Sequence, residues 1–282
     1  MNGALFGLLS AFSYSLKDFF IKKGLKNVDK YFLLIFGNLL MVVILFIFAL
    51  NSKFVFPSLK IFLLIALIGL IGSLALLSFY KALEVGKLAV VSAIASSHAI
   101  VPLVLSPYFY NEKLSLLQGI GILFAIFGVV LCSFKYADLK KLKINNIGKG
   151  VNYAIFAMVG WGLYAFLQKP SIEELGPAIS IFYIECSIVV FSFILFFKKI
   201  KRNHLKKKEI KYFIGISLLL ASAVLFLSYG ISYGKVSIVA ALGGLSPIMA
   251  LFFSTFLLKE KITLNQKIGI FLSVIGVVLI SL

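Results

Sequence analysis

Residues 112–133 read EKLSLLQGIGILFAIFGVVLCS, and residues 260–281 read EKITLNQKIGIFLSVIGVVLIS. Both stretches place a Glu-Lys pair ahead of an apolar run, with a glutamine six residues after the glutamate and two glycines seven residues apart. An apolar run of this length is typical of a helix that crosses a membrane. The two stretches therefore indicate a membrane-embedded helical chain that contains an internal repeat.

The composition of the whole chain agrees with a membrane environment. Hydrophobic residues make up 61% of the 282 residues, 13% are charged, and the mean hydropathy is +1.08. A soluble domain is about half apolar and about a quarter charged. Backbone polar groups in lipid must bond within their own segment, so each apolar run of about 20 residues predicts a helix. The ten predicted helices cover 3–22, 32–50, 60–80, 88–109, 116–134, 150–168, 177–197, 212–233, 236–258 and 264–282.

The charged residues of the chain lie mainly between these runs. Lysine and arginine number 28 against 10 acidic residues, giving a net charge of +18. The cations form short clusters and not a stripe beside aromatic residues, so nucleic-acid binding is not expected. The most basic loop, 198–211, is interpreted as an anchor at the lipid headgroups. The apolar start of the chain predicts no cleavable signal peptide.

The internal repeat extends beyond the two opening stretches. Shifting the chain by 148 residues places 86–133 on 234–281, with 19 of 48 positions identical. A weaker match, at an offset of 147, pairs Tyr14, Leu16, Phe19 and Lys22 with Trp161, Leu163, Phe166 and Lys169. We interpret the chain as a first repeat (1–134), a basic linker (135–149) and a second repeat (150–282). Five helices per repeat oblige the second copy to enter the membrane from the opposite face, an inverted topology that is typical of secondary transporters.

The predicted fold is therefore an all-α integral membrane protein, with ten transmembrane helices in two inverted five-helix repeats around a central cavity. Over its whole length the chain resembles EamA-type members of the drug/metabolite transporter superfamily. The motifs that carry the resemblance are Trp161-Gly162, the Glu-Lys turn of each repeat, and the glycine pairs Gly121/Gly128 and Gly269/Gly276. The first repeat departs from the pattern, because it has Ser13-Tyr14-Ser15 in place of Trp-Gly.

The resemblance implies that helices 1, 3, 4, 6, 8 and 9 surround the cavity, with helices 5 and 10 at the periphery. It also implies a transport activity. It does not fix a substrate, because relatives carry amino acids, drugs, sugars and other metabolites.

The fourth and ninth runs hold small, polar and proline residues at matching depth. The fourth contains Ser96, Ser97, His98 and Pro102, and the ninth contains Gly243, Gly244, Ser246 and Pro247. Two interpretations stay open: close helix packing with kinks at the prolines, or paired kinked walls of a cavity that flex during transport. His98 fits either an interhelical hydrogen bond or a proton carrier.

Glu185, near the middle of the seventh run, is the most costly charge in the chain to place in a bilayer. It fits either a structural hydrogen bond or a role in proton coupling or cation binding. Tyr14 and Asp18 are four residues apart and share one face of the first helix. The full set of candidate cavity residues is Tyr14, Asp18, Ser96, Ser97, His98, Trp161, Tyr164, Glu185, Tyr229 and Ser246.

The leading functional hypothesis is a multi-pass secondary transporter of the cell membrane. It would export a small metabolite, amino acid or drug-like compound by alternating access. Its expected partners are that substrate, membrane lipids and, at Glu185, a coupling proton. No Walker A motif is present, so the chain is expected to carry no ATPase of its own. The sequence does not fix the oligomeric state.

Two other function classes have specific sequence requirements. A membrane-embedded enzyme acting on lipid-linked substrates would need an acid/base or metal cluster. His98 and His204 stand in quite different settings, and Cys132 and Cys186 lie inside apolar runs without metal-ligand spacing. We therefore expect no enzymatic activity, metal or cofactor. A channel or a scaffold is the third class, although no selectivity-filter-like loop is present.

The loops also bear on orientation. With ten spans, the loops on one side carry 22 lysines and arginines and those on the other carry 5. The positive-inside rule then places both termini outside the cytoplasm. The family resemblance implies cytoplasmic termini, so the two arguments disagree.

Overall fold

A computed structural model of the chain describes residues 3–24, 29–85, 91, 94–132, 150–200, 207–258 and 263–281. Within these ranges every regular element is a helix, which confirms the all-helical prediction. The elements are α1 (Gly3–Gly24), α2 (Lys30–Leu50), α3 (Leu59–Val85), η1 (Ser97–Ala99), α5 (Ile100–Phe109), α6 (Leu116–Cys132), α9 (Val151–Leu175), α10 (Pro177–Phe196), η2 (Phe197–Lys199), α11 (Lys207–Tyr233), α12 (Val236–Gly243), α13 (Ser246–Leu258) and α14 (Leu264–Ser281).

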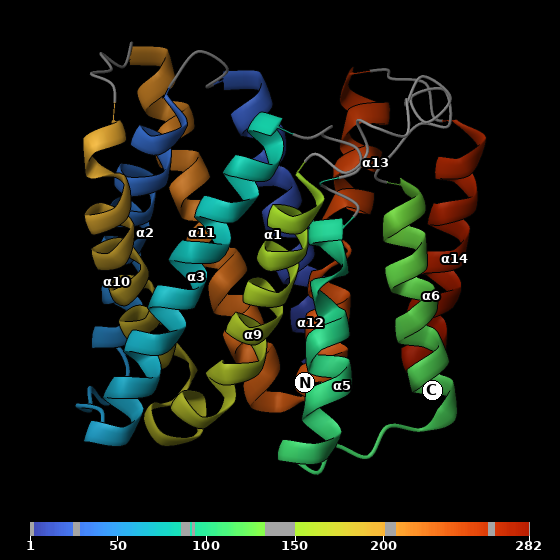
Figure 1. The fold of residues 1–282 in the computed structure, drawn as a ribbon, viewed down its shortest axis with the longest axis horizontal. Helices are drawn as coiled ribbons and strands as arrows, with labels where there is room; N and C mark the ends of the chain where they lie inside the picture. The colour runs from blue at the N-terminus through green and yellow to red at the C-terminus, as the bar shows by residue number, and fades with distance from the viewer. Residues whose placement is uncertain are drawn as a thin grey trace.

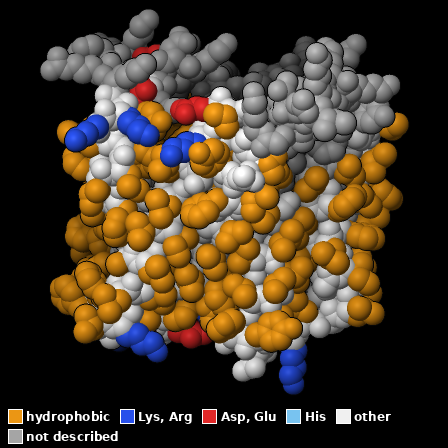
Figure 2. Space-filling view, in the orientation of Figure 1, with side chains coloured by type: hydrophobic (Ala, Val, Ile, Leu, Met, Phe, Trp, Pro, Cys, Tyr) orange, Lys and Arg blue, Asp and Glu red, His pale blue; other side chains and the backbone are white. Residues whose placement is uncertain are grey.

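The helices follow the predicted apolar runs. Within the described residues, five stretches are long and apolar enough to cross a membrane: Leu59–Ala82, Val151–Leu175, Pro177–Lys199, Glu209–Tyr233 and Val236–Phe253. Shorter apolar helices cover Leu34–Leu50, Ile94–Phe109, Leu116–Cys132 and Leu264–Ile280. Hydrophobic side chains cover the middle of the face seen in Figure 2, and the charged side chains visible there lie near its upper and lower edges. A band of this kind fits the hydrocarbon layer of a bilayer.

Helix α9 is longer than its apolar run, as are α3, which continues to Val85, and α11, which begins at Lys207. The sixth predicted helix ends at residue 168, whereas α9 continues to Leu175. Its last two turns carry Lys169, Glu173 and Glu174, which reach the end of the bundle, where polar side chains no longer need to be excluded. Gly176 follows with φ +78°, and Pro177 begins α10 directly after it. This tight turn makes α9 and α10 neighbours. The predicted linker 135–149 lies outside the described residues.

The helix bundle has both chain ends at the same end, the lower one in Figure 1. α1 begins at this end, and α9 begins at the upper end and descends. α1 packs on α11, α3 on α9, and α6 on α14. The pair formed by α6 and α14 lies at one edge of the bundle.

Glycines allow two of these helix pairs to approach closely. A Cβ placed on Gly3 would lie 2.7 Å from the carbonyl oxygen of Gly230 and 2.7 Å from Cα of Gly234. In the second pair, a Cβ on Gly121 would lie 2.8 Å from the carbonyl oxygen of Gly276. Helices in lipid gain little from the hydrophobic effect, so backbone approach of this kind is a main source of their association.

The fourth and ninth membrane segments are each interrupted. In the fourth, the 3₁₀ turn η1 stands before α5, and in the ninth α12 ends at Gly243 before α13 begins at Ser246. Pro102 is the third residue of α5 and Pro247 the second residue of α13. A proline in the first turn of a helix lacks an N–H that would have no intrahelical partner there. The two breaks fall at equivalent positions of the repeat.

Candidate functional site

The centre of the candidate site is a buried carboxylate held by a phenol. The Tyr164 hydroxyl on α9 donates a hydrogen bond of 2.7 Å to Oε1 of Glu185 on α10. Glu185 is 4% exposed. Among the residues that the structure describes, no lysine, arginine or histidine forms an ion pair with it. A carboxylate so placed must carry a proton or be neutralised by a bound cation, because a lone charge in a low-dielectric interior is costly.

Further polar side chains lie around this pair. Tyr14 on α1 packs against the same core cluster as Tyr164 and lies within electrostatic range of Glu185. Gln168, one helical turn after Tyr164, is fully buried beside it, and neither of its amide atoms makes a hydrogen bond of regular geometry within the described part of the chain. The hydroxyl of Ser15, next to Tyr14, is also buried without such a partner. Buried polar groups are normally hydrogen-bonded, so these atoms are available to a bound molecule.

A second group of predicted residues lies where the interrupted segments meet. A Cβ on Gly244 would lie 3.6 Å from Cε1 of His98, so the two breaks face each other there. Nδ1 of His98 is buried and has no hydrogen-bond partner among the described residues. Ser97 is buried, and Ser96 and Ser246 are half-buried. His98 and Gly244 make the contact between the two breaks, and the three serines lie beside the breaks in the sequence.

The Trp-Gly motif has a packing explanation. A Cβ on Gly162 would lie 2.5 Å from the carbonyl oxygen of His98 and 2.5 Å from Cβ of Val101. Only glycine therefore allows α9 to lie against η1 and the start of α5 at this distance. Trp161 points elsewhere, with its ring 5.0 Å from that of Phe79 on α3.

The remaining predicted residues do not join the Glu185 cluster as direct partners. Asp18 is half-exposed and forms an ion pair of 2.8 Å with Lys17. The two side chains leave the helix about 100° apart, but they are long enough to meet. Tyr229 stacks on Phe6, with 5.9 Å between the ring centroids, and it also packs against the core cluster that contains Ile184.

Gln168 and Ser15 were not predicted from the sequence. Gln168 is the last residue of the sixth apolar run, and an amide at that position usually indicates the end of a membrane segment. Ser15 is a small residue inside an apolar run, which is usually a packing position. Their significance comes from buried atoms without partners, and this depends on the tertiary structure.

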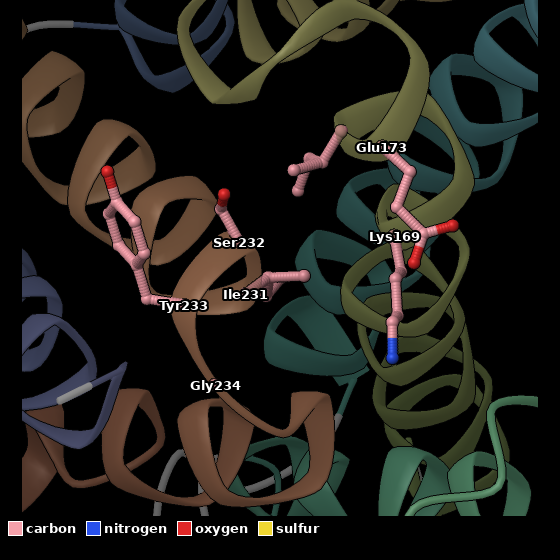
Figure 3. A pocket seen from close by; sticks show the side chains of 7 residues that line it. Lys169, Glu173, Ile231, Ser232, Tyr233 and Gly234 are labelled. Carbon is pink, nitrogen blue, oxygen red and sulfur yellow. The ribbon is translucent and has the colours of Figure 1, made fainter.

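A cavity of about 430 Å³ opens at the lower end of the bundle, between the last turns of α9 and α11. Lys169 and Glu173 border it on one side, and Ser232 and Tyr233 on the other (Figure 3). Ile172, Ile231 and Gly234 complete its lining. The cavity contains both signs of charge, and Ile172 in its lining lies one helical turn after Gln168, on the same face of α9. The cavity is therefore a polar vestibule. It lies on the face of α9 that also carries Tyr164 and Gln168 of the Glu185 cluster.

Comparison with known proteins gives the family. Residues 1–134 and 148–282 each match the EamA-like transporter family. The chain belongs to this family. Membership confirms the resemblance seen in the sequence and places the chain in the drug/metabolite transporter superfamily, as a multi-pass membrane protein.

Individual relatives agree with the family. The chain is 38% identical over 76 residues to an uncharacterised protein of Methanocaldococcus jannaschii, a match that covers 27% of this chain and 56% of that protein. It is 31% identical over 123 residues to an uncharacterised transporter of Archaeoglobus fulgidus, which covers 43% of each chain. The chain thus spans about half the length of the curated relatives it matches. One solved crystal structure has a TM-score of 0.81 at 13% identity, covering 99% of this chain and 96% of that chain, and so shares the fold.

Proposed function

We propose that this EamA-type transporter is a secondary transporter of the cell membrane. It carries a small metabolite, amino acid or drug-like compound by alternating access, with export as the net direction. The substrate binds at the cluster of Tyr14, Tyr164, Gln168 and Glu185. The fold is ten membrane spans in two inverted repeats, 1–134 and 150–282.

Three observations support the inverted repeats. The family matches 1–134 and 148–282 separately. α1 and α9, which begin the two repeats, run in opposite directions through the bundle (Figure 1). The breaks at Ser97–Ala99 and between Gly243 and Ser246 are related by the same 148-residue shift that aligns the sequences. In inverted-repeat transporters the substrate lies near the midplane, beside interrupted helices.

The observation that carries the proposal is the setting of Glu185. Among the described residues its carboxylate is held by the phenol of Tyr164 alone, and it gains a partner when a proton or a cationic group binds. The buried amide of Gln168 and the buried hydroxyl of Ser15 offer hydrogen bonds to the rest of a substrate, because neither makes a hydrogen bond of regular geometry among the described residues. Such a site couples substrate binding to the charge state of one residue. This is the basis of our proposal that Glu185 couples transport to a proton.

The experiment is a transport assay on the purified protein in proteoliposomes. A panel of amino acids, other metabolites and drug-like compounds is tested with and without a pH gradient, and then repeated with Glu185→Gln. Proton coupling through Glu185 predicts that the variant loses gradient-driven flux but retains exchange of labelled for unlabelled substrate. Glu174→Gln is the matched control, because Glu174 receives hydrogen bonds from Ser58 at the end of the bundle and lies apart from the cluster.

Two outcomes would count against the proposal. An unchanged gradient response in Glu185→Gln would remove Glu185 from the coupling mechanism. Flux that neither saturates nor shows counterflow would indicate a channel and not a carrier.

A further inference from the structure

A proline near the end of α9 determines how a lysine is held beside the vestibule. Pro170 has no N–H, so the carbonyl of Phe166, four residues earlier, lacks its intrahelical partner. The Tyr110 hydroxyl donates to this carbonyl at 2.7 Å. The hydrogen bond fixes the Tyr110 ring, and Nζ of Lys169 lies 4.7 Å from the centre of that ring. Lys169 therefore has a fixed aromatic support of the kind that cations favour.

The carboxylate that faces Lys169 is already satisfied by other donors. Glu112, 6% exposed, accepts hydrogen bonds from the N–H of Val236 at 2.7 Å, and from the hydroxyl and the N–H of Ser237 at 2.7 and 3.3 Å. Nζ of Lys169 lies 3.7 Å from Oε1 of Glu112, which is longer than a hydrogen bond. Among the described residues, the Lys169 ammonium donates no hydrogen bond, so its three N–H groups are available to a ligand.

Glu173 is the second charged residue of the vestibule. It is exposed and lies one helical turn after Lys169, on the same face of α9. A lysine four residues before a glutamate is the less favourable order for a helical ion pair, and within the described part of the chain Glu173 forms neither an ion pair nor a hydrogen bond. Its neighbour Glu174, by contrast, accepts hydrogen bonds from the N–H and the hydroxyl of Ser58 at 2.7 and 2.8 Å. Glu173 is thus an acceptor without a protein donor in these ranges.

The opposite wall of the vestibule is the end of α11, seen across from Lys169 and Glu173 in Figure 3. The last carbonyl groups of a helix lack intrahelical partners, and the helix dipole is negative there, so this wall favours a cationic group near Glu173. Ile172 and Ile231 add apolar contact. The volume of about 430 Å³ lies within the usual range of small-molecule pockets, about 300–1,000 Å³.

We propose that the vestibule is a binding site for a zwitterionic small molecule with an apolar side chain. Its carboxylate pairs with the ammonium of Lys169, and its ammonium pairs with the carboxylate of Glu173. The site is separate from the Glu185 cluster. The further statement that this molecule is the cargo rests on the proposed transport function, whereas its binding in the vestibule does not.

A ligand with a single charge suits the vestibule less well than a zwitterion. An anion paired with Lys169 would lie close to the carboxylates of Glu112 and Glu173, and a cation paired with Glu173 would lie close to Lys169. Like charges at such separations repel, so each single charge is disfavoured by the residue that its partner leaves unpaired. A zwitterion satisfies both residues at once. Its zero net charge also lowers the cost of entering the bundle interior.

The same ligand chemistry fits the interior cluster. Ile172, Gln168 and Tyr164 follow one another at one-turn intervals on the face of α9 that borders the vestibule. Tyr164 holds Glu185 at 2.7 Å, and the ammonium of a zwitterion is the kind of cationic partner that Glu185 lacks among the described residues. The buried amide of Gln168 offers a donor to the carboxylate. One ligand class therefore suits both positions along α9.

The test measures how well a ligand protects a cysteine in the vestibule from alkylation. Ser232→Cys is placed on the Cys132→Ala, Cys186→Ala background, because Ser232 lines the cavity. The rate of reaction of the purified protein with a maleimide is measured against the concentration of three compounds. L-leucine carries both charges. Isocaproate has the same side chain and carboxylate but no ammonium, and isoamylamine has the same side chain and ammonium but no carboxylate.

The proposal predicts that L-leucine protects the cysteine at a concentration at least about tenfold lower than either analogue, since each analogue lacks one charged contact. Lys169→Gln should remove the advantage of L-leucine over isoamylamine, and Glu173→Gln should remove its advantage over isocaproate. Glu174→Gln is the matched control and should change neither ratio, because that carboxylate serves Ser58. An alkylation rate without ligand that equals the parent rate shows that a variant is folded.

Three results would overturn the vestibule site. One is equal protection by the three compounds, and another is no protection by L-leucine at about 50 mM, well above the usual range of KM. The third is protection that survives Lys169→Gln and Glu173→Gln but is lost in Glu185→Gln, which would place the ligand at the interior cluster.

Binding is measured without flux, so failure here is distinct from failure of the transport assay. Protection by L-leucine without saturable leucine flux would uphold the vestibule site and remove its ligand as the cargo. Saturable flux of a panel compound, with no protection by L-leucine, would uphold the proposed transport function and overturn the vestibule site.

Discussion

The Tyr164 hydroxyl and the Glu185 carboxylate form a 2.7 Å hydrogen bond between two neighbouring helices in the interior of the bundle. Tyr164 belongs to α9 and Glu185 to α10, and the Gly176-Pro177 turn connects the two helices. The bond fixes the direction of the carboxylate and supplies one donor to it. If Glu185 takes part in substrate binding, the phenol positions it.

Tyr164→Phe tests this positioning role. Loss of a hydrogen bond to a charged group costs about 1.5–3 kcal/mol, which corresponds to about a 10- to 150-fold change in an equilibrium constant. We expect the KM for transport to rise by about tenfold or more, because binding must then orient the carboxylate. The measurement is concentration-dependent uptake in proteoliposomes, with any substrate found in the panel.

Tyr183→Phe is the matched control. Tyr183 lies two residues before Glu185, and its hydroxyl has no hydrogen-bond partner among the described residues. Removing it should leave KM within about twofold, since no bond is lost. Equal effects of the two substitutions would show that the Tyr164–Glu185 bond has no role in binding.

Gly162 provides a prediction about stability. A Cβ at this position would lie 2.5 Å from the carbonyl oxygen of His98. The backbone cannot retreat without separating α9 from η1, so Gly162→Ala should lower the free energy of unfolding by about 1–3 kcal/mol, the usual cost of overpacking. Thermal unfolding in detergent, followed by Trp161 fluorescence, measures it.

Gly215→Ala is the control for backbone effects. Gly215 lies within α11, and a Cβ there would meet no atom within 4 Å. Alanine is the better helix former by about 1 kcal/mol, so this variant should be as stable as the parent or more stable. The explanation for the Trp-Gly motif fails if Gly162→Ala and Gly215→Ala unfold at the same temperature.

The helices could be predicted from the sequence because their signal is local. Each apolar run carries its own evidence, and the runs at 32–50 and 116–134 agree with α2 and α6 to within two residues. The family could likewise be predicted, because the Glu-Lys turn and the glycine pairs recur at a fixed spacing. Bilayer proteins give unusually clear signals of this kind, since lipid forbids most other structures.

The composition of the site could be predicted only in part. Glu185 stood out because a charge in an apolar run is costly wherever it points. Tyr164 is also among the predicted cavity residues, but it lies 21 residues away, and no local pattern identifies it as the partner of Glu185. Glu112 and Ser237 are 125 residues apart, and only the tertiary structure brings them within 2.7 Å. Pairing across helices depends on rotation about each helix axis, which short motifs do not specify.

The orientation of the bundle can be tested with the basic loop. Loop charge predicts that residues 198–211 face the cytoplasm, whereas the family resemblance implies the reverse. His204, within this loop, lies outside the described residues, and His204→Cys on the Cys132→Ala, Cys186→Ala background provides a label site. Protection from an impermeant maleimide in intact cells is expected, because the positive-inside rule counts short loops most heavily. Labelling of this variant in intact cells would show that the charge rule fails for this chain.

Substitution of Gln168 is predicted to affect stability and transport differently. Its amide is fully buried, and neither amide atom makes a hydrogen bond of regular geometry within the described part of the chain. Gln168→Met fills a similar volume and removes the unpaired polar atoms. We expect the free energy of unfolding to stay equal or to rise by about 1–3 kcal/mol, the penalty for a buried unpaired group. If the amide serves the substrate, the same variant should raise KM by about tenfold, the value of one hydrogen bond of about 1.4 kcal/mol.

Gln266→Met is the contrasting variant for this prediction. Gln266 accepts from the N–H and hydroxyl of Thr263 and donates to the Cys132 carbonyl at 3.3 Å. Removing its amide leaves those groups without a partner, so this substitution should destabilise the protein by about 1–3 kcal/mol. Opposite stability changes at the two glutamines, with loss of substrate affinity at Gln168, are the signature of a binding residue. A Gln168→Met protein that is destabilised, and that transports with unchanged KM, would place Gln168 in the structural framework and outside the substrate site.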